Sequence, residues 1–256
     1  MFDQFSRTRL LLGDDAMDAL ARARVAVFGI GGVGSYAAEA LARSGVGALD
    51  LVDHDQVSLT NINRQIVALQ STVGMNKADV MAARIADINP RCTVTPHVCF
   101  FLQDTADQID LAQFDYIVDA VDTVTAKLLL IGRANELGVP IISSMGSANK
   151  LDPTALAAGD IYDTSICPLA RIIRKECRKR GIDRLKVVYS TEPAIQPSEE
   201  SQQAYREEAE AFAESSGAPC PDKFGRAGIP ASTAFVPPAA GLILASEVVK
   251  DLIASA

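Results

Sequence analysis

The first 145 residues alternate between short apolar segments and amphipathic segments, and this alternation constrains the fold more than any other feature. Apolar runs that end in glycine or polar residues predict buried strands, whereas apolar residues three and four positions apart predict helices. Strand–helix–strand units require parallel pairing with right-handed crossovers. The predicted fold class is therefore α/β, with a doubly wound, mostly parallel sheet and helices on both faces. We expect strands at 24–29, 47–53, 92–100, 115–121 and 140–145, and helices at 33–44, 75–90 and 124–137.

The second half of the chain is less regular. It predicts a basic helix at 168–180 and a strand at 186–190, and an acidic solvated helix or mobile insertion at 198–216. Residues 227–246 carry no charge, but their prolines favour a buried loop and half a helix over a membrane span.

No linker divides the 256 residues, so the sequence predicts a single domain. Its nucleotide-binding half would cover about 1–145, and a smaller mixed α/β half would cover about 146–256.

Composition limits the compartment and the partners. The formal charge of −8 gives no global attraction to nucleic acid, so a polyanion must meet a local basic patch. Five cysteines without a CxxC pair indicate reduced thiols and no zinc site, and the N-terminus does not resemble a signal peptide. We expect a cytoplasmic protein without a membrane span.

A glycine-rich loop, Gly29-Ile30-Gly31-Gly32-Val33-Gly34, follows the first strand and opens a helix. Glycines let backbone N–H groups approach a phosphate, and the helix N-terminus favours its negative charge. Asp53 ends the next strand, about 20 residues further on, where a carboxylate can bind ribose hydroxyls. These features alone fit an NAD(P) oxidoreductase, and glycines that serve only helix packing are a further alternative.

Polar residues after Asp53 separate these alternatives. Asn61, Arg64 and Gln65 would lie near the phosphates, and Lys77 opens the next predicted helix. Asp122 follows a strand, where doubly wound sheets bind ligands. Cations for phosphate oxygens and a carboxylate for Mg²⁺ suit a triphosphate better than a dinucleotide. The predicted nucleotide contacts are Gly29, Gly31, Gly32, Gly34, Asp53, Asp55, Asn61, Arg64, Gln65, Lys77 and Asp122.

The segments GIGGVGS, LVDHDQVSLTNINRQ, VGMNKADV and VDAVDT, in this order, resemble the ubiquitin-activating-enzyme-like (HesA/MoeB/ThiF) superfamily. This resemblance implies adenylation of a carboxylate with ATP and Mg²⁺. It places Gly31 and Gly32 beside the nucleotide and Asp53 on the ribose. The phosphates would be held by Asn61, Arg64 and Lys77, and the metal by Asp122.

The N-terminal FSRT resembles the family's arginine segment, in which an arginine reaches the ATP site of the partner subunit. The resemblance implies a homodimer in which Arg7, or else Arg9, joins Arg64, Lys77 and Asp122 in catalysis. A solvated arginine on a mobile tail is the alternative.

The activated carboxylate is a separate question. Many relatives activate a ubiquitin-like or sulfur-carrier protein and carry two CxxC pairs, which this chain lacks. Ubiquitin activators also need a thiolate. Cys167 and Cys220 are candidates by exposure, but neither has a histidine or acidic-base pattern nearby, which favours unreactive thiols.

TSICPLARIIRKECRKRGI, KVVYSTEP and FVPPAAGLILASEVVKDL resemble the branch that dehydrates threonylcarbamoyladenosine in tRNA. By resemblance, ATP would activate the threonyl carboxylate, and the ureido group of the same nucleoside would close a ring and release AMP. Intramolecular attack has a large proximity advantage, so no enzyme nucleophile is required.

A basic run supports a tRNA substrate. Eight of the 24 basic residues fall within 171–186. Leu169, Ile172, Ile173 and Cys177 would form the buried stripe of a helix and leave the cations exposed to phosphates. The candidate tRNA contacts are Arg171, Arg174, Lys175, Arg178 and Lys179, with an ordinary solvated face as the alternative.

Three functions remain open from the sequence. The leading one is the tRNA dehydratase, which would release AMP and pyrophosphate and could use a sulfur-relay or carrier protein as a further partner. The second is an adenylyltransferase for a ubiquitin-like or sulfur-carrier protein. The third is a non-catalytic relative, which the joint presence of Arg64, Lys77 and Asp122 disfavours.

Overall fold

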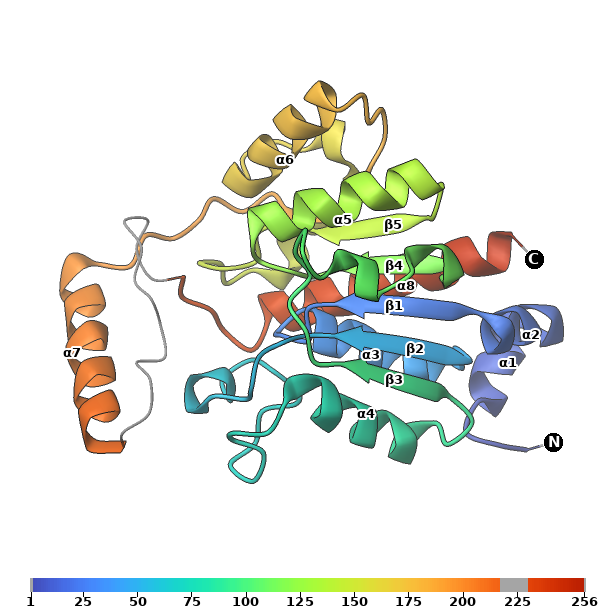
Figure 1. Ribbon diagram of the computed structural model, residues 1–256, viewed down its shortest axis with the longest axis horizontal. Helices are drawn as coiled ribbons and strands as arrows, with labels where there is room; N and C mark the ends of the chain where they lie inside the picture. The colour runs from blue at the N-terminus through green and yellow to red at the C-terminus, as the bar shows by residue number, and fades with distance from the viewer. Residues whose placement is uncertain (1, 217–229, 256) are drawn as a thin grey trace.

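The computed structural model describes residues 2–216 and 230–255, and seven strands form one sheet within them (Figure 1). The strand order is β3-β2-β1-β4-β5-β7-β6, and only the β6–β7 pair is antiparallel. The predicted doubly wound, mostly parallel sheet is confirmed. The strands are β1 (Arg24–Phe28), β2 (Ala48–Val52), β3 (Thr93–His97), β4 (Tyr116–Asp119), β5 (Ile141–Ser144), β6 (Leu156–Asp160) and β7 (Lys186–Ser190).

Helices cover both faces of the sheet. The apolar cluster on one face includes residues of α3, α4 and α8, and α5 packs on the other face against Phe28 and Ile117. The acidic helix α7 stands apart from the sheet in Figure 1. The α-helices are α1 (Ser6–Leu12), α2 (Asp14–Arg22), α3 (Gly34–Ser44), α4 (Lys77–Ile88), α5 (Val124–Leu137), α6 (Pro168–Lys179), α7 (Glu199–Ser216) and α8 (Val236–Ala254).

The chain reverses its direction of travel across the sheet between β1 and β4. From β1 it proceeds to β2 and β3 on one side, and from β4 it proceeds to β5 on the other. Right-handed crossovers therefore put α3 and α5 on opposite faces, and the loops that follow β1 and β4 diverge. This divergence opens a crevice at the carboxyl ends of the two central strands.

Three local features refine the sequence predictions. Pro96 lies inside β3 without breaking the sheet. Proline cannot donate a hydrogen bond to a neighbouring strand, but β3 is an edge strand with a neighbour on one side only, so this loss is tolerated. The helix expected near the C-terminus is α8, with Pro237 and Pro238 in its first turn, where a missing N–H costs little. The antiparallel β6 and the helices α1 and α2 were not predicted.

Among residues 2–216 and 230–255, no helix combines the length and apolarity that a bilayer crossing requires.

The close packing of α8 against α3 generates a stability prediction. A Cβ at Gly241 in α8 would lie 2.2 Å from the Val33 carbonyl oxygen, so Gly241→Ala should destabilise by about 1–3 kcal/mol through overpacking. Gly132 in α5 is the matched control, because its nearest atom would be 4.0 Å away. Gly132→Ala should stabilise by about 0.5–1 kcal/mol, since alanine is the better helix former. Urea unfolding measures both variants, and equal free energies of unfolding would contradict the packing argument.

Candidate active site

A cavity of about 510 Å³ opens at the carboxyl ends of β1 and β4, and its size suits a small-molecule ligand. All the predicted nucleotide contacts except Gly34 line it, namely Gly29, Gly31, Gly32, Asp53, Asp55, Asn61, Arg64, Gln65, Lys77 and Asp122. Residues from four separate segments of the chain thus converge on one site.

The glycine loop combines two different roles. Gly29 has a φ of +87°, and a Cβ there would lie 2.6 Å from the Ala120 carbonyl oxygen, so β1 and β4 can approach only without a side chain. Gly34 does not line the cavity, and a Cβ on it would lie 1.8 Å from the Gly29 carbonyl oxygen. Gly34 therefore serves the turn into α3, whereas Gly31 and Gly32 form the cavity wall.

Asp53, directly after β2, is fixed by the backbone. Its Oδ2 accepts a hydrogen bond from the Ile30 N–H at 2.6 Å, and its Oδ1 accepts one from the Asp55 N–H at 2.8 Å. Burial raises the pKa of this carboxyl, although Lys77 and the two backbone donors oppose that effect. The carboxylate faces the cavity beside the glycine loop, which is the position expected of a ribose acceptor.

Lys77, the first residue of α4, is 5% exposed, and its Nζ lies 2.7 Å from Asp55 Oδ2. The backbone sets this geometry, because the Lys77 N–H donates to the Asp55 carbonyl and an isolated bridge joins Gln56 to Asn76. The ion pair holds the ammonium group at the cavity wall. A bound phosphate could replace Asp55 as the partner of the Lys77 ammonium group.

The η1 turn (Leu59–Asn61) and the residues after it supply three polar groups. Asn61 Oδ1 accepts a hydrogen bond from the Ser58 N–H at 3.1 Å, which leaves its NH₂ group for a ligand. Arg64 donates from Nη1 to Asn63 Oδ1 and to the Thr60 carbonyl. Gln65 is 7% exposed, and its Oε1 is the only buried side-chain polar atom without a partner in the described chain. An orphaned buried acceptor in the cavity wall indicates a ligand with a hydrogen-bond donor.

Asp122 lies in the loop that follows β4 and is exposed at the cavity, with Oδ1 accepting only the Thr123 hydroxyl at 3.3 Å. Its oxygens are therefore accessible to a divalent cation. Asp53, His54 and Asp55 form a second group that could hold a metal ion, since their ligand atoms lie within 4.8 Å of one another. Two of its members already have partners in Ile30 and Lys77. Carboxylates and glycines together fit a nucleotide phosphate with Mg²⁺.

Sequence reasoning missed part of the cavity wall. Phe100, just beyond β3, lines the cavity, and its ring centroid lies 4.1 Å from that of His54. The segment 144–148, which begins at the last residue of β5, also lines it. The position of 144–148 could have been predicted from its place at a strand end. No comparable sequence signal marks Phe100, which follows an interrupted edge strand.

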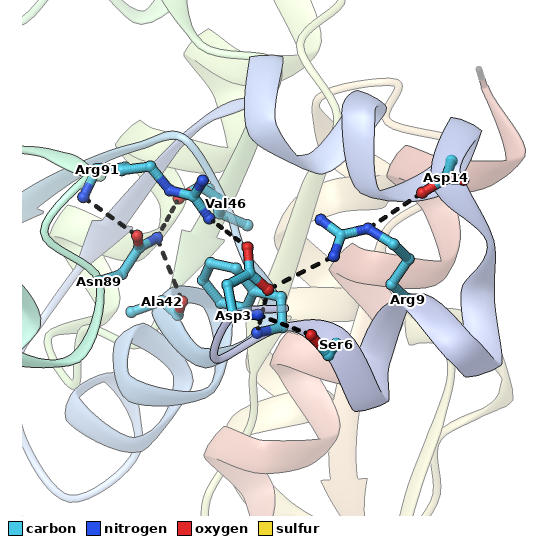
Figure 2. Close-up of polar contacts among 9 residues, drawn as sticks. Asp3, Ser6, Arg9, Asp14, Ala42, Val46, Asn89 and Arg91 are labelled. Carbon is cyan, nitrogen blue, oxygen red and sulfur yellow. Dashed lines mark hydrogen bonds and ion pairs between the residues drawn. The ribbon is translucent and has the colours of Figure 1, made fainter. Parts of the chain in front are cut away.

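The N-terminal helix α1 lies beside the amino ends of the strands (Figure 1), and none of its residues lines the cavity. Figure 2 shows that Arg9 has local partners, with ion pairs to Asp3 at 3.5 Å and to Asp14 at 3.1 Å. Arg7 is exposed and has no ion-pair partner within the described chain. Arg9 is therefore the weaker candidate, and Arg7 does not line the cavity.

The basic helix α6 starts at the cavity, where Leu169 is part of the wall. Its buried stripe is Ala170, Ile173 and Cys177, so the prediction was wrong for Ile172, which is 45% exposed, and only partly right for Leu169.

The five candidate tRNA contacts on α6 differ in whether their side chains already have partners within the protein. Arg174 donates to the Thr164 carbonyl at 2.7 Å and to its hydroxyl, Arg178 lies over the Tyr162 ring, and Lys179 pairs with Glu176. Arg171 and Lys175 are exposed, and no side-chain partner is found for them in the described part of the chain. These two are the best placed to bind an external phosphate.

The four cysteines within the described residues are buried or half-buried, which does not favour nucleophilic attack. Cys167 is 3% exposed, which corrects the expectation that it is accessible, and Cys220 lies outside the described residues. Cys99 lines the cavity, but burial raises the pKa of its thiol. Burial also raises the pKa of Cys92 to about 11. A thiol with a raised pKa is a poor nucleophile at neutral pH.

The cavity combines a glycine loop, a buried carboxylate placed for a ribose and cations placed for phosphates. It lies where the chain reverses its direction across the sheet. These features define a nucleotide-binding α/β protein. More specifically, the chain belongs to the ThiF family, whose model matches residues 5–255. The family predicted from the sequence motifs is thereby confirmed.

Individual relatives are similar over most of the chain. The tRNA threonylcarbamoyladenosine dehydratase of Bacillus subtilis (strain 168) is 44% identical over 256 residues, covering 99% of this chain and 96% of that protein. That of Escherichia coli (strain K12) is 40% identical over 205 residues, or 76% of this chain and 75% of that protein. The E. coli TcdA crystal structure in complex with ATP matches with a TM-score of 0.82 and 32% identity, covering 98% and 94% of the two chains.

Proposed function

We propose that this protein is an ATP-dependent dehydratase that acts on threonylcarbamoyladenosine in tRNA and closes its side chain into a ring. The observation that carries the proposal is the convergence of the glycine loop, Asp53, Lys77 and Asp122 on one cavity. The similarity to dehydratases along nearly the whole chain supports the choice of substrate. The cytoplasm, with its reduced thiols and its tRNA, is the compartment in which we place the reaction.

The reaction has two steps that balance. An oxygen of the threonyl carboxylate attacks the α-phosphorus of ATP, and pyrophosphate leaves. The ureido group then attacks the activated carbonyl carbon, loses a proton and displaces AMP. One carboxylate oxygen leaves on AMP, so the nucleoside loses the elements of water, and proximity within one molecule drives the second step.

The cavity residues divide the work of this scheme. The Gly31 and Gly32 backbone and the α3 N-terminus would bind the phosphates, and Asp53 would accept hydrogen bonds from the ribose. Lys77 and Arg64 stabilise the charge that develops on the departing pyrophosphate. Asp122 would hold Mg²⁺, which when bound would screen the phosphate oxygens from the incoming carboxylate. The unpartnered Gln65 Oε1 offers an acceptor to a ligand donor.

Removing one phosphate clamp tests the ATP chemistry. Lys77→Ala and Arg64→Ala should each reduce tRNA-dependent AMP release at least tenfold, because one preorganised donor to a developing charge contributes about 2.7–4 kcal/mol in comparable sites. Arg43→Ala is the control, since Arg43 is exposed on α3 and pairs only with Glu39. Rates of AMP release unchanged by all three substitutions would contradict the assigned roles.

The tRNA contact of α6 is a separate proposal. Arg171→Ala with Lys175→Ala should weaken tRNA binding and reduce its salt dependence while ATP binding persists, because each neutralised phosphate releases counterions. Arg174→Ala serves as a comparison that disturbs the contact with Thr164. Filter binding at several salt concentrations measures the effect. Unchanged tRNA affinity and salt slope in the double variant would exclude α6 from the interface.

We further propose a homodimer in which Arg7 enters the partner's cavity, because Arg7 is exposed on α1 and does not line the cavity of its own subunit. Arg7→Ala and Asp122→Ala should each abolish most activity, and mixing the two proteins should restore part of it through hybrid dimers. Light scattering supplies the oligomeric state. A monomer, or exchanging subunits without restored activity, would refute the contribution of Arg7 across an interface.

An adenylyltransferase for a carrier protein is the alternative outcome. It would transfer the adenylyl group of ATP to the C-terminal carboxylate of the carrier and release pyrophosphate. A thiol could then accept the acyl group and displace AMP, and Cys99 is the cavity cysteine to examine. A Cys99→Ala variant with unchanged dehydratase activity supports the intramolecular route. An acyl-thioester that accumulates on a cysteine supports the alternative.

A further inference from the structure

A fully buried ion pair lies beneath the cavity floor. Lys127 in α5 and Asp119 at the end of β4 are both 0% exposed, and Lys127 Nζ lies 2.8 Å from Asp119 Oδ2. The ammonium group also donates to Ser143 Oγ at 3.1 Å and to the Ser144 carbonyl at 3.0 Å. Ser143 Oγ in turn donates to Asp119 Oδ2 at 2.6 Å. All three donors of the lysine are thus satisfied.

This network occupies the point at which β4 and β5 separate. The parallel ladder between them ends at the pair Asp119–Ser143, so Ser144 has no partner on β4. Lys127 supplies the missing donor to the Ser144 carbonyl. Asp119 Oδ1 accepts the Val121 N–H at 3.2 Å and fixes the first turn of the other loop. A single ammonium therefore joins two diverging backbones.

Stability alone does not explain a buried charge pair here. Removing two charges from water costs several kcal/mol per ion, and apolar pairs of similar volume often give equal or greater stability. An apolar side chain, however, could not donate to the Ser144 carbonyl, and a buried carbonyl left unpaired is destabilising. The ion pair is therefore better suited to holding the two diverging backbones in a defined orientation than to stabilising the fold.

Both loops that the network fixes belong to the cavity wall. Residues 120–123 follow β4 and include Asp122, and residues 144–148 comprise the last residue of β5 and the loop after it. Neither Asp119 nor Lys127 lines the cavity. The network thus lies behind the reacting groups and does not touch them.

We infer that Lys127 is a positioning residue, which holds the 120–123 and 144–148 loops in the arrangement that adenylation requires. The inference rests on the proposed function for its kinetic consequence, but its structural consequence can be measured on the protein without substrate. In the absence of the ammonium, Asp122 should lose its fixed position at the cavity.

The test compares three variants of the whole chain. Lys127→Met removes the charge at similar length, and Asp119→Asn with Lys127→Met removes both charges while an asparagine oxygen can still accept the Val121 N–H. Arg84→Met is the matched control, because Arg84 pairs with the buried Glu39 between α3 and α4, away from the cavity. Readouts are amide hydrogen exchange, ATP affinity by calorimetry, and kcat and KM for tRNA-dependent AMP release.

We expect the Lys127 variants to show at least tenfold faster exchange within 120–123 and 144–148, and a kcat at least tenfold lower. The control should leave both loops and kcat within twofold of wild type even if its thermal stability falls. If the single variant does not fold, the neutral double variant decides the question.

Unchanged loop exchange and kcat in a folded Lys127 variant would overturn the inference, as would failure of both Lys127 variants to fold. Failure of the proposed function is distinguishable, because wild-type protein would then release no AMP with modified tRNA. In that case, hydrogen exchange in the two loops and ATP affinity would still test whether Lys127 positions the loops.

Discussion

The close approach of β1 and β4, followed by the divergence of their loops, is the constraint on which the rest of the structure depends. It requires glycine at position 29, where any side chain would collide with the Ala120 carbonyl. The crossovers then send α3 and α5 to opposite faces, and the crevice between their N-terminal ends becomes the cavity. The predicted nucleotide contacts that line the cavity surround this crevice. The separate divergence of β4 from β5 leaves the Ser144 carbonyl for Lys127 to satisfy.

The cavity balances opposite charges before any ligand is bound. Lys77 forms an ion pair with Asp55. Asp53 accepts hydrogen bonds from two backbone N–H groups, and its burial raises the pKa of its carboxyl. A nucleotide would offer ribose hydroxyls to Asp53 and phosphate oxygens to Lys77. These groups would add to or replace the present partners, which satisfy the two charges only in part. Binding energy of this kind can be used to stabilise charge that appears only during phosphate displacement.

The alternating pattern was sufficient to predict the doubly wound sheet, because buried parallel strands and amphipathic helices have distinct periods. Strand β6 was missed because Leu156–Asp160 contains neither a long apolar run nor a clear alternation. The site was predictable where motifs carry it, as at Asp53 and Lys77. Phe100, the Lys127 network and the internal bonds of Arg174 depend on contacts between distant segments, and no local pattern records those.

The most direct measurement is the mass of the modified nucleoside after the purified protein acts on tRNA that carries threonylcarbamoyladenosine. With ATP and Mg²⁺, the nucleoside should become about 18 mass units lighter, as ring closure with loss of water requires, and AMP should appear in equal amount. The mass should not change without ATP. An unchanged mass with ATP present, despite intact nucleotide binding and the addition of cell extract to supply a partner protein, would contradict the dehydratase assignment.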